Sequence, residues 1–83
     1  MKNSEFRAWL SGYFAVASDD RLNREKIFII GNHLNLVKAV EGNLDEFNQK
    51  IFDLVDKVFQ DSTEENIIAA QKQMVKWLSE YYS

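Results

Sequence analysis

The chain of 83 residues contains neither cysteine nor proline, and it has only three glycines. Without cysteine there is no disulfide bridge, no thiolate metal site and no thiol redox chemistry. Because helix-breaking residues are so rare, little in the sequence interrupts a long helix. A domain of this size buries only a modest share of its surface, so its helices must pack well or associate with another molecule.

The sequence also lacks a surplus of cations and any long hydrophobic run. Ten lysines and arginines against 13 acidic residues leave a net charge of −3, which disfavours binding to nucleic acids or anionic membranes. The longest apolar runs, residues 13–17 and 27–30, are far shorter than the ~20 residues that cross a bilayer. With no secretion leader recognisable, we expect a cytoplasmic protein that binds neither nucleic acid nor membrane.

What the sequence does contain is apolar residues at helical spacing. Hydrophobic residues make up 46% of the chain, enough for a core and too many for a disordered segment. Their recurrence at every third or fourth position predicts helices over residues 4–17, 21–41, 44–60 and 63–81. We therefore predict a single all-α domain over residues 1–83, a compact four-helix fold with one short N-terminal helix and three longer antiparallel helices.

Capping residues mark the expected helix ends. Asn3 or Ser4 would open the first helix, Asn43 the third and Ser62 the fourth. In each case a side-chain oxygen would accept a hydrogen bond from an unpaired backbone amide of the first turn. Residues 18–20 form a turn and cap cluster before the second helix, which Gly42 would end in the left-handed conformation. Gly12, opposite the apolar stripe of the first helix, is expected to allow another backbone to approach.

Each predicted helix has one face expected to lie in the core. The inward residues are Phe6, Trp9, Leu10, Tyr13, Phe14 and Ala17; Leu22, Ile29, Ile30, Leu34, Leu36, Val37 and Val40; Leu44, Phe47, Ile51, Leu54, Val55 and Val58; and Ile67, Ala70, Met74, Trp77, Leu78 and Tyr81. Ile27 is placed at the edge of the second stripe. A competing interpretation makes residues 26–30 a buried strand, because Ile-Phe-Ile-Ile is rich in strand-forming residues.

Little in the sequence indicates catalysis. His33 is the only histidine, and it could act as a pH switch or base; the simpler interpretation is a half-buried residue bonded to one partner. The acidic residues of the third helix match no metal-binding spacing and are best explained as a solvated face. We therefore expect no catalytic residue, metal or cofactor, and no enzyme activity.

One cluster of cations could bind an anion. Arg21, Arg24 and Lys26 lie together at the expected start of the second helix, where positive charge is locally unfavourable. They could hold a phosphate or an acidic partner. The alternative is that they only keep the helix start soluble.

Aromatic residues outside the apolar stripes are the clearest sign of an interaction surface. Phe28 projects away from the second helix's stripe, on the side of Arg24 and Gly31, and Phe52 and Phe59 lie seven residues apart off the third helix's stripe. Clustered exposed aromatics are typical of interfaces. Phe28, Arg24, Phe52 and Phe59 are therefore the candidate partner-binding residues, unless another helix of the chain covers them.

The first 40 residues also carry a recognisable pattern. The element Phe6-Arg-Ala-Trp-Leu-Ser-Gly-Tyr13 is followed by Leu22 and then by the apolar residues 26–30 and 32–37. This resembles small proteins of tailed bacteriophages that begin with a Phe-x-x-Trp-Leu-x-Gly-aromatic helix, a linker and an amphipathic helix. The resemblance implies a viral origin and expression in the cytoplasm of a bacterial host. That family has no established activity, so the resemblance assigns no catalytic residue.

These observations favour a non-enzymatic module that binds another protein, with a host or defence protein as the target if the resemblance holds. A second hypothesis is a homo-oligomeric virion or assembly component in which the same aromatics meet their symmetry mates. A third is a small-ligand binder, in which Arg21, Arg24 and Lys26 hold the phosphate of a nucleotide.

Overall fold

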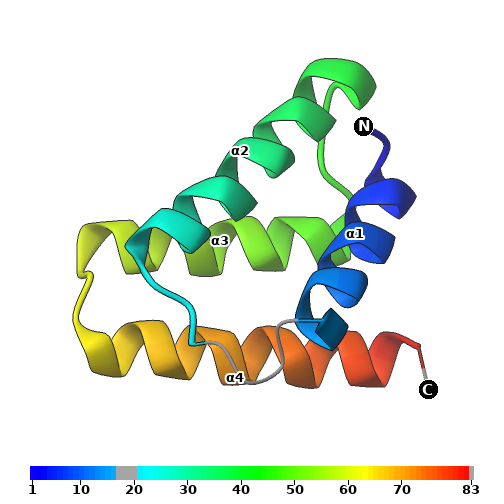
Figure 1. The fold of residues 1–83 in the computed structure, drawn as a ribbon. Coiled ribbons are helices and arrows are strands. Elements are labelled where there is room, and N and C mark those ends of the chain that lie inside the picture. The colour runs from blue at the N-terminus through cyan, green and yellow to red at the C-terminus, as the bar shows by residue number, and fades with distance from the viewer. Residues whose placement is uncertain (17–20, 83) are drawn as a thin grey trace.

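The computed structural model describes residues 1–16 and 21–82 and contains four α-helices in that part of the chain (Figure 1). They are α1 (Asn3–Val16), α2 (Arg24–Glu41), α3 (Glu46–Gln60) and α4 (Glu64–Tyr81). α3 and α4 run antiparallel, α2 crosses α3 obliquely, and α1 packs against all three others at the end where α4 terminates. The predicted compact all-α four-helix fold is confirmed.

Side-chain caps explain where three of the helices begin. Asn23, Asp45 and Thr63 each accept a hydrogen bond from the amide three residues on, at 2.9, 2.9 and 3.3 Å. Gly42 ends α2 with φ at 84°, in the left-handed region predicted for it, and its amide donates to the Lys38 carbonyl at 2.8 Å. Local capping chemistry therefore sets these boundaries.

Two predicted caps were each wrong by one or two positions. Asp45, not Asn43, opens α3, because Asp45 has the extended backbone of a cap and the preceding Leu44 lies in the core, where it is 9% exposed. Thr63, not Ser62, opens α4, because the Ser62 hydroxyl instead donates to the Val58 carbonyl at 2.9 Å and helps to end α3. In both cases the tertiary position of the loop decided which polar residue capped the helix.

The start of α2 settles the competing strand interpretation. Residues 26–30 are helical, and no strand occurs among residues 1–16 and 21–82. Ile27 and Ile30, three positions apart, are both buried, as one face of a helix requires. The helix begins at Arg24 rather than at residue 21 because Asn23 caps it. The predicted end of the first helix at residue 17 and the turn at residues 18–20 lie outside the described residues.

The core lies where the inner faces of all four helices meet. Its buried apolar residues are Phe6, Leu10, Phe14, Leu22, Ile27, Ile30, Leu34, Val37, Leu44, Ile51, Val55, Val58, Ala70, Met74 and Leu78. A second ring of partly buried residues packs against it, among them Trp9, Tyr13, Phe47, Leu54, Ile67 and Trp77. Most of the predicted inward residues are therefore in contact with the core.

The apolar stripe predicted for α2 is wider than the face of the helix that the fold buries. Ile27, expected at the edge, is fully buried, whereas Ile29, Leu36 and Val40 are 46%, 53% and 61% exposed. The reason is that α2 packs mainly against α1 and α3, which together cover only part of its circumference. Tyr81 is likewise half exposed rather than inward.

Asn3 and Gly12 also have roles other than those expected. Among the described residues, no atom apart from the adjoining backbone of α1 lies within 4 Å of a Cβ built on Gly12, so no other helix of residues 1–16 and 21–82 approaches closely there. Asn3 is the first residue of α1 rather than its cap, and its side-chain oxygen accepts from the Asp45 amide at 3.0 Å and from Asn48 Nδ2 at 2.8 Å. Asn3 therefore attaches the start of α1 to the start of α3.

Candidate binding groove between α2 and α3

A groove lined by three phenylalanines runs along the line where α2 crosses α3. Two adjoining hollows form it, and both are lined by Phe28 of α2 and Phe59 of α3. The larger hollow, about 620 Å³, adds Arg24, Glu25 and Ile29. The smaller, about 170 Å³, is lined in addition by Gly31, Asn32, Asn35, Phe52, Val55 and Asp56. Together they make an open, largely apolar depression on the surface.

Gly31 brings the two helices close together beneath this groove. It is buried, and a Cβ at this position would lie 3.3 Å from Val55 Cγ1 and 3.6 Å from Phe59 Cε2. A methyl group here would require Val55 to shift by a few tenths of an ångström, since 3.3 Å is closer than ordinary van der Waals contact. Phe28 and Asn35, about one turn to either side of Gly31, then line the groove above its floor.

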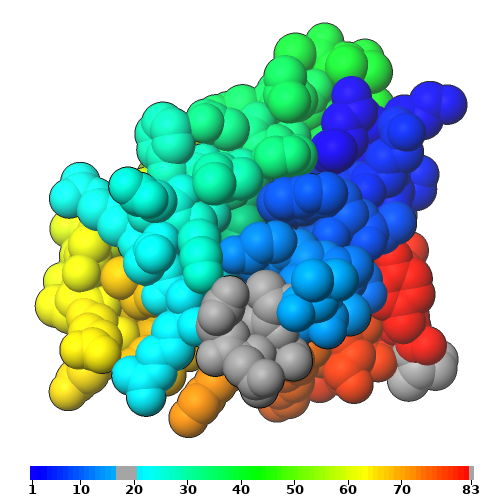
Figure 2. Space-filling model, viewed as in Figure 1, coloured from blue at the N-terminus to red at the C-terminus, as the bar shows by residue number. Residues whose placement is uncertain are grey.

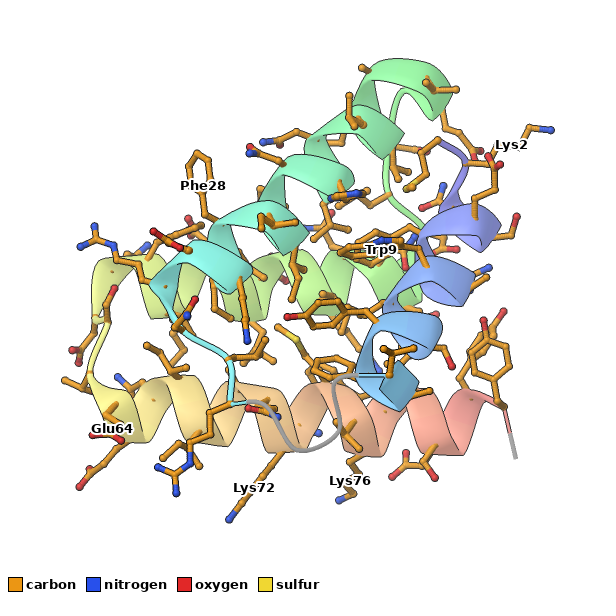
Figure 3. The ribbon with its side chains drawn as sticks, in the orientation of Figure 1. Lys2, Trp9, Phe28, Glu64, Lys72 and Lys76 are labelled. Atoms are coloured by element: carbon orange, nitrogen blue, oxygen red, sulfur yellow. The ribbon has the colours of Figure 1, made fainter. Side chains whose placement is uncertain are left out.

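Phe28 is the most exposed aromatic of the groove. Its side chain projects from α2 away from the body of the molecule (Figure 3) and is 57% exposed. Its ring meets Phe59 edge to face, with centroids 6.1 Å apart and planes at 75°, a favoured geometry for aromatic pairs. Phe59 itself is half-buried. Phe59 therefore forms part of the floor of the groove, and Phe28 forms an exposed side wall.

Phe52 lies in the smaller hollow, where a cation covers it. The Lys38 ammonium sits 3.9 Å from the Phe52 ring centroid, within range of a cation–π interaction. Phe52 is half-buried. The structure therefore leaves Phe52 less accessible than Phe28.

Arg24 lines the opposite, wider hollow of the groove. It is exposed, and within the described residues no hydrogen bond or ion pair engages it. Glu25 lines the same hollow and partly offsets its charge. The structure thus places all four candidate residues, Phe28, Arg24, Phe52 and Phe59, around one groove.

The three cations of the proposed phosphate cluster have different surroundings. Arg21 pairs with Glu64 at 3.4 Å and lines a separate hollow beside α4, into whose rim Lys72 and Lys76 extend (Figure 3). Lys26 Nζ donates to the Arg21 carbonyl at 3.4 Å. Arg24 belongs to the groove. No common anion site formed by Arg21, Arg24 and Lys26 is visible in the described contacts.

His33 is placed by its neighbours as a structural residue. Its ring stacks on Trp9 of α1, with centroids 3.9 Å apart and planes at 11°. Nδ1 lies 2.8 Å from the Ile29 carbonyl oxygen, so this nitrogen carries the proton and donates. The simpler interpretation, a half-buried ring bonded to one partner, matches these contacts. Across residues 1–16 and 21–82, no three histidine or acidic side chains gather closely enough to hold a metal ion.

A polar cluster at the other end of α3 was not anticipated from sequence. Arg7 pairs with Asp45, and its guanidinium lies 4.8 Å from the Tyr81 ring centroid. Burial lowers the pKa of Arg7, but the hydrogen bond and the attraction to Asp45 outweigh burial and raise the pKa overall. Arg7 therefore stays charged. The neighbouring Asn48 is fully buried, and its Nδ2 donates to both oxygens of Asn3, at 3.1 and 2.8 Å.

Sequence reasoning missed two features of the surface around α2. The first is the role of Gly31, which its position inside an otherwise apolar helix could have signalled. The second is the exposure of Ile29, Leu36 and Val40, which no local signal reveals because it depends on which neighbours cover the helix.

Comparison with known proteins adds no assignment: no protein-family model, curated protein or solved structure matches this chain. Among the helices of the described ranges, none has both the length and the apolar character needed to cross a lipid bilayer.

Proposed function

We propose that this protein is a non-enzymatic module that binds another protein through the groove between α2 and α3. The observation that carries the proposal is the exposure of Phe28, at 57%, above a floor formed by Phe59 and Val55. A large aromatic held at an open apolar depression loses more water-exposed surface on binding than a scattered surface residue does. Aromatic residues, phenylalanine among them, are enriched at protein interfaces, where a few residues supply most of the binding free energy.

The shape and chemistry of the groove favour a helical partner segment. The groove follows the line between two crossing helices, as do the hydrophobic grooves that accept the apolar face of an amphipathic helix. Arg24 adds a cation at its wider hollow, and arginine is enriched at such interfaces because its planar fork pairs with carboxylates. We therefore propose a partner segment with apolar residues at helical spacing and an acidic residue at one end.

The resemblance to tailed-bacteriophage proteins supports a narrower version of this proposal. The residues that carry it, such as Phe6, Leu10 and Tyr13, lie in α1 and contribute to the core or its margin. These residues bear on the fold and not on the groove. The viral origin that the resemblance implies would place the protein inside a bacterial host, and we therefore propose a host or defence protein as the partner.

The experiment compares three tagged forms of the full chain as baits in a lysate of the cells in which the protein is naturally expressed. The wild type and Val75→Glu should capture the same protein, whereas Phe28→Glu should not. Val75 is an exposed apolar residue of α4, so it controls for adding a negative charge to an apolar surface site.

Binding is then measured by calorimetry with the captured protein and each bait purified. We expect Phe28→Glu to weaken binding at least tenfold, because loss of a central aromatic costs about 2 kcal/mol or more. Circular dichroism should show the same helix content for all three forms. Equal binding by Phe28→Glu and the wild type, or no captured protein at all, would rule out the groove as a protein-binding site.

A further inference from the structure

A second apolar surface runs along the outer side of α2 and meets the groove only at Ile29, which lines the larger hollow. It consists of Ile29, His33, Leu36 and Val40, and is called the outer stripe below. Three of these residues are about half exposed or more, and His33 is half-buried against Trp9. At 100° per residue the four positions fall within an arc of about 60°, and no charged residue of α2 lies in that arc between Ile29 and Val40.

The outer stripe widens the apolar face of α2 beyond the part that the core covers. The buried part carries Ile27, Ile30, Leu34 and Val37, and at 100° per residue it is centred about 110° from the stripe, so the two together span about half of the helix circumference. An apolar face of a helix is normally covered across its whole width. In the described part of the chain, α1 and α3 pack beside α2 (Figure 2 shows α1 alongside it) and leave the stripe open. Spacings of three and four residues make such a stripe suited to contact with another helix.

We infer that the outer stripe binds a second copy of this chain, with the two α2 helices antiparallel across a twofold axis. The intervals along the stripe are four, three and four residues, so they read the same in both directions. In the antiparallel register Ile29 lies opposite Val40 of the second copy, and His33 lies opposite Leu36. The same surface is therefore complementary to itself, as a twofold interface requires.

The charges along α2 agree with this arrangement. The stripe itself is uncharged, so pairing buries no unpaired ion. Arg24 lies on the groove side of α2, and Glu25 and Lys26, which flank the start of the stripe, have opposite charges. The last turn likewise carries one cation and one anion, Lys38 and Glu41, so the antiparallel arrangement sets no net like charges against each other. The net charge of −3 on each copy opposes association only over long distances that salt screens.

The size of the surface predicts a reversible dimer. α2 has 18 residues and is about 27 Å long, so one helix pair buries less than the ~800 Å² per partner of a standard interface. Each copy already has its own buried core, and folding therefore does not require the dimer. We expect a dissociation constant on the order of micromolar.

Sedimentation equilibrium on the full chain tests the association. Between about 1 and about 200 µM, which brackets that dissociation constant, the wild type should rise from the monomer mass of 9.7 kDa toward twice that mass. Leu36→Glu, which places a charge at an exposed stripe position, should stay monomeric, and Val75→Glu should dimerise like the wild type. A wild type that remains monomeric, or a Leu36→Glu variant that dimerises equally, would overturn the inference.

Cysteine pairs test the antiparallel register, since the chain has no cysteine of its own. Ile29→Cys mixed with a tagged Val40→Cys should form a disulfide-linked pair under mild oxidation. Neither variant alone should do so, because identical positions would lie about 16 Å apart along the axis, beyond the reach of a disulfide. Self-linking by Val40→Cys would indicate a parallel pair and overturn the arrangement.

The outer stripe and the groove can fail independently. Leu36→Glu should lose the dimer yet still bind the protein captured through the groove, whereas Phe28→Glu should lose that protein. A wild type that stays monomeric would contradict the dimer but not the binding of a partner in the groove. Failure to capture a partner would contradict the groove proposal but not the dimer.

Discussion

Gly31 lies so close to Val55 that a methyl group on its Cα would come within 3.3 Å of Val55 Cγ1. The contact joins α2 to α3 at the middle of the groove. Gly12, in contrast, lies in α1 where no atom of the described residues, apart from the adjoining helix backbone, is within 4 Å of the same added methyl. The two glycines are therefore a matched pair: an added methyl would be crowded at position 31 and unobstructed at position 12.

Replacing each glycine by alanine should separate these two roles. Gly12→Ala should stabilise the protein by about 0.5–1 kcal/mol, the gain in helix propensity at an unobstructed position. Gly31→Ala gains the same propensity but crowds Val55, at a cost of about 1–3 kcal/mol. Urea unfolding followed by circular dichroism should therefore rank Gly12→Ala as the more stable variant. Equal gains in the free energy of unfolding would show that the close approach at Gly31 has no energetic consequence.

A negative charge should be poorly tolerated at the position of the buried Asn48. Its buried Nδ2 donates to two oxygens of Asn3, and an aspartate cannot make either bond. We expect Asn48→Asp to lower the free energy of unfolding by about 1–3 kcal/mol or more, since buried acceptors lose their donor and a charge is buried. The same change at the exposed Asn32 serves as the control and should cost less than about 0.5 kcal/mol. Chemical denaturation of both variants measures the difference, and similar losses would contradict this role for Asn48.

Asp45 combines two functions that two substitutions can separate. Its carboxylate caps α3 by accepting from the Asn48 amide, and it also pairs with the largely buried Arg7. Asp45→Asn should keep the cap and lose the ion pair, whereas Asp45→Ala should lose both. We expect the alanine variant to be less stable by about a further 1 kcal/mol, the usual value of a cap. Thermal unfolding at matched ionic strength provides the measurement, and identical stabilities would mean that the cap contributes nothing.

The stacked rings of Trp9 and His33 should couple α1 to α2. A double-mutant cycle with Trp9→Leu and His33→Ala should give an interaction energy of about 0.5–1.5 kcal/mol, the range for aromatic pairs beyond simple burial. Trp77 and Lys50, whose ring and ammonium are 5.9 Å apart at the surface, form a comparison pair expected to couple more weakly. Urea unfolding of the four forms in each cycle tests this. If the two substitutions changed the free energy of unfolding additively, the stacking of Trp9 and His33 would contribute no stability of its own.

Much of the architecture could be predicted from the sequence because helix formation and helix ends depend on residues close together in the chain. The interval of three or four between apolar residues predicted all four helices, and Gly42 ended α2 in the left-handed conformation as expected. Errors arose where two polar residues competed for one cap. Asn43 and Asp45 are both good caps by chemistry, and the burial of Leu44 between them decided in favour of Asp45.

The candidate groove was predictable in its parts but not in its assembly. Phe28, Phe52 and Phe59 stood out because each lies off its helix's apolar stripe. Their meeting in one groove depends on the angle at which α2 crosses α3 and on the close approach at Gly31. Arg21, Arg24 and Lys26 show the converse, since residues adjacent in the chain have separate surroundings in the fold.

Local patterns in the chain set the helical class, the approximate extent of each helix and most of the residues that fill the core, because period and capping act within a few residues. Which side of α2 stays uncovered depends on long-range packing, which leaves Ile29, Leu36 and Val40 exposed to water and buries Ile27 in the core. An apolar helix face specifies burial but not the neighbour that provides it, and that neighbour is set by how distant segments pack together.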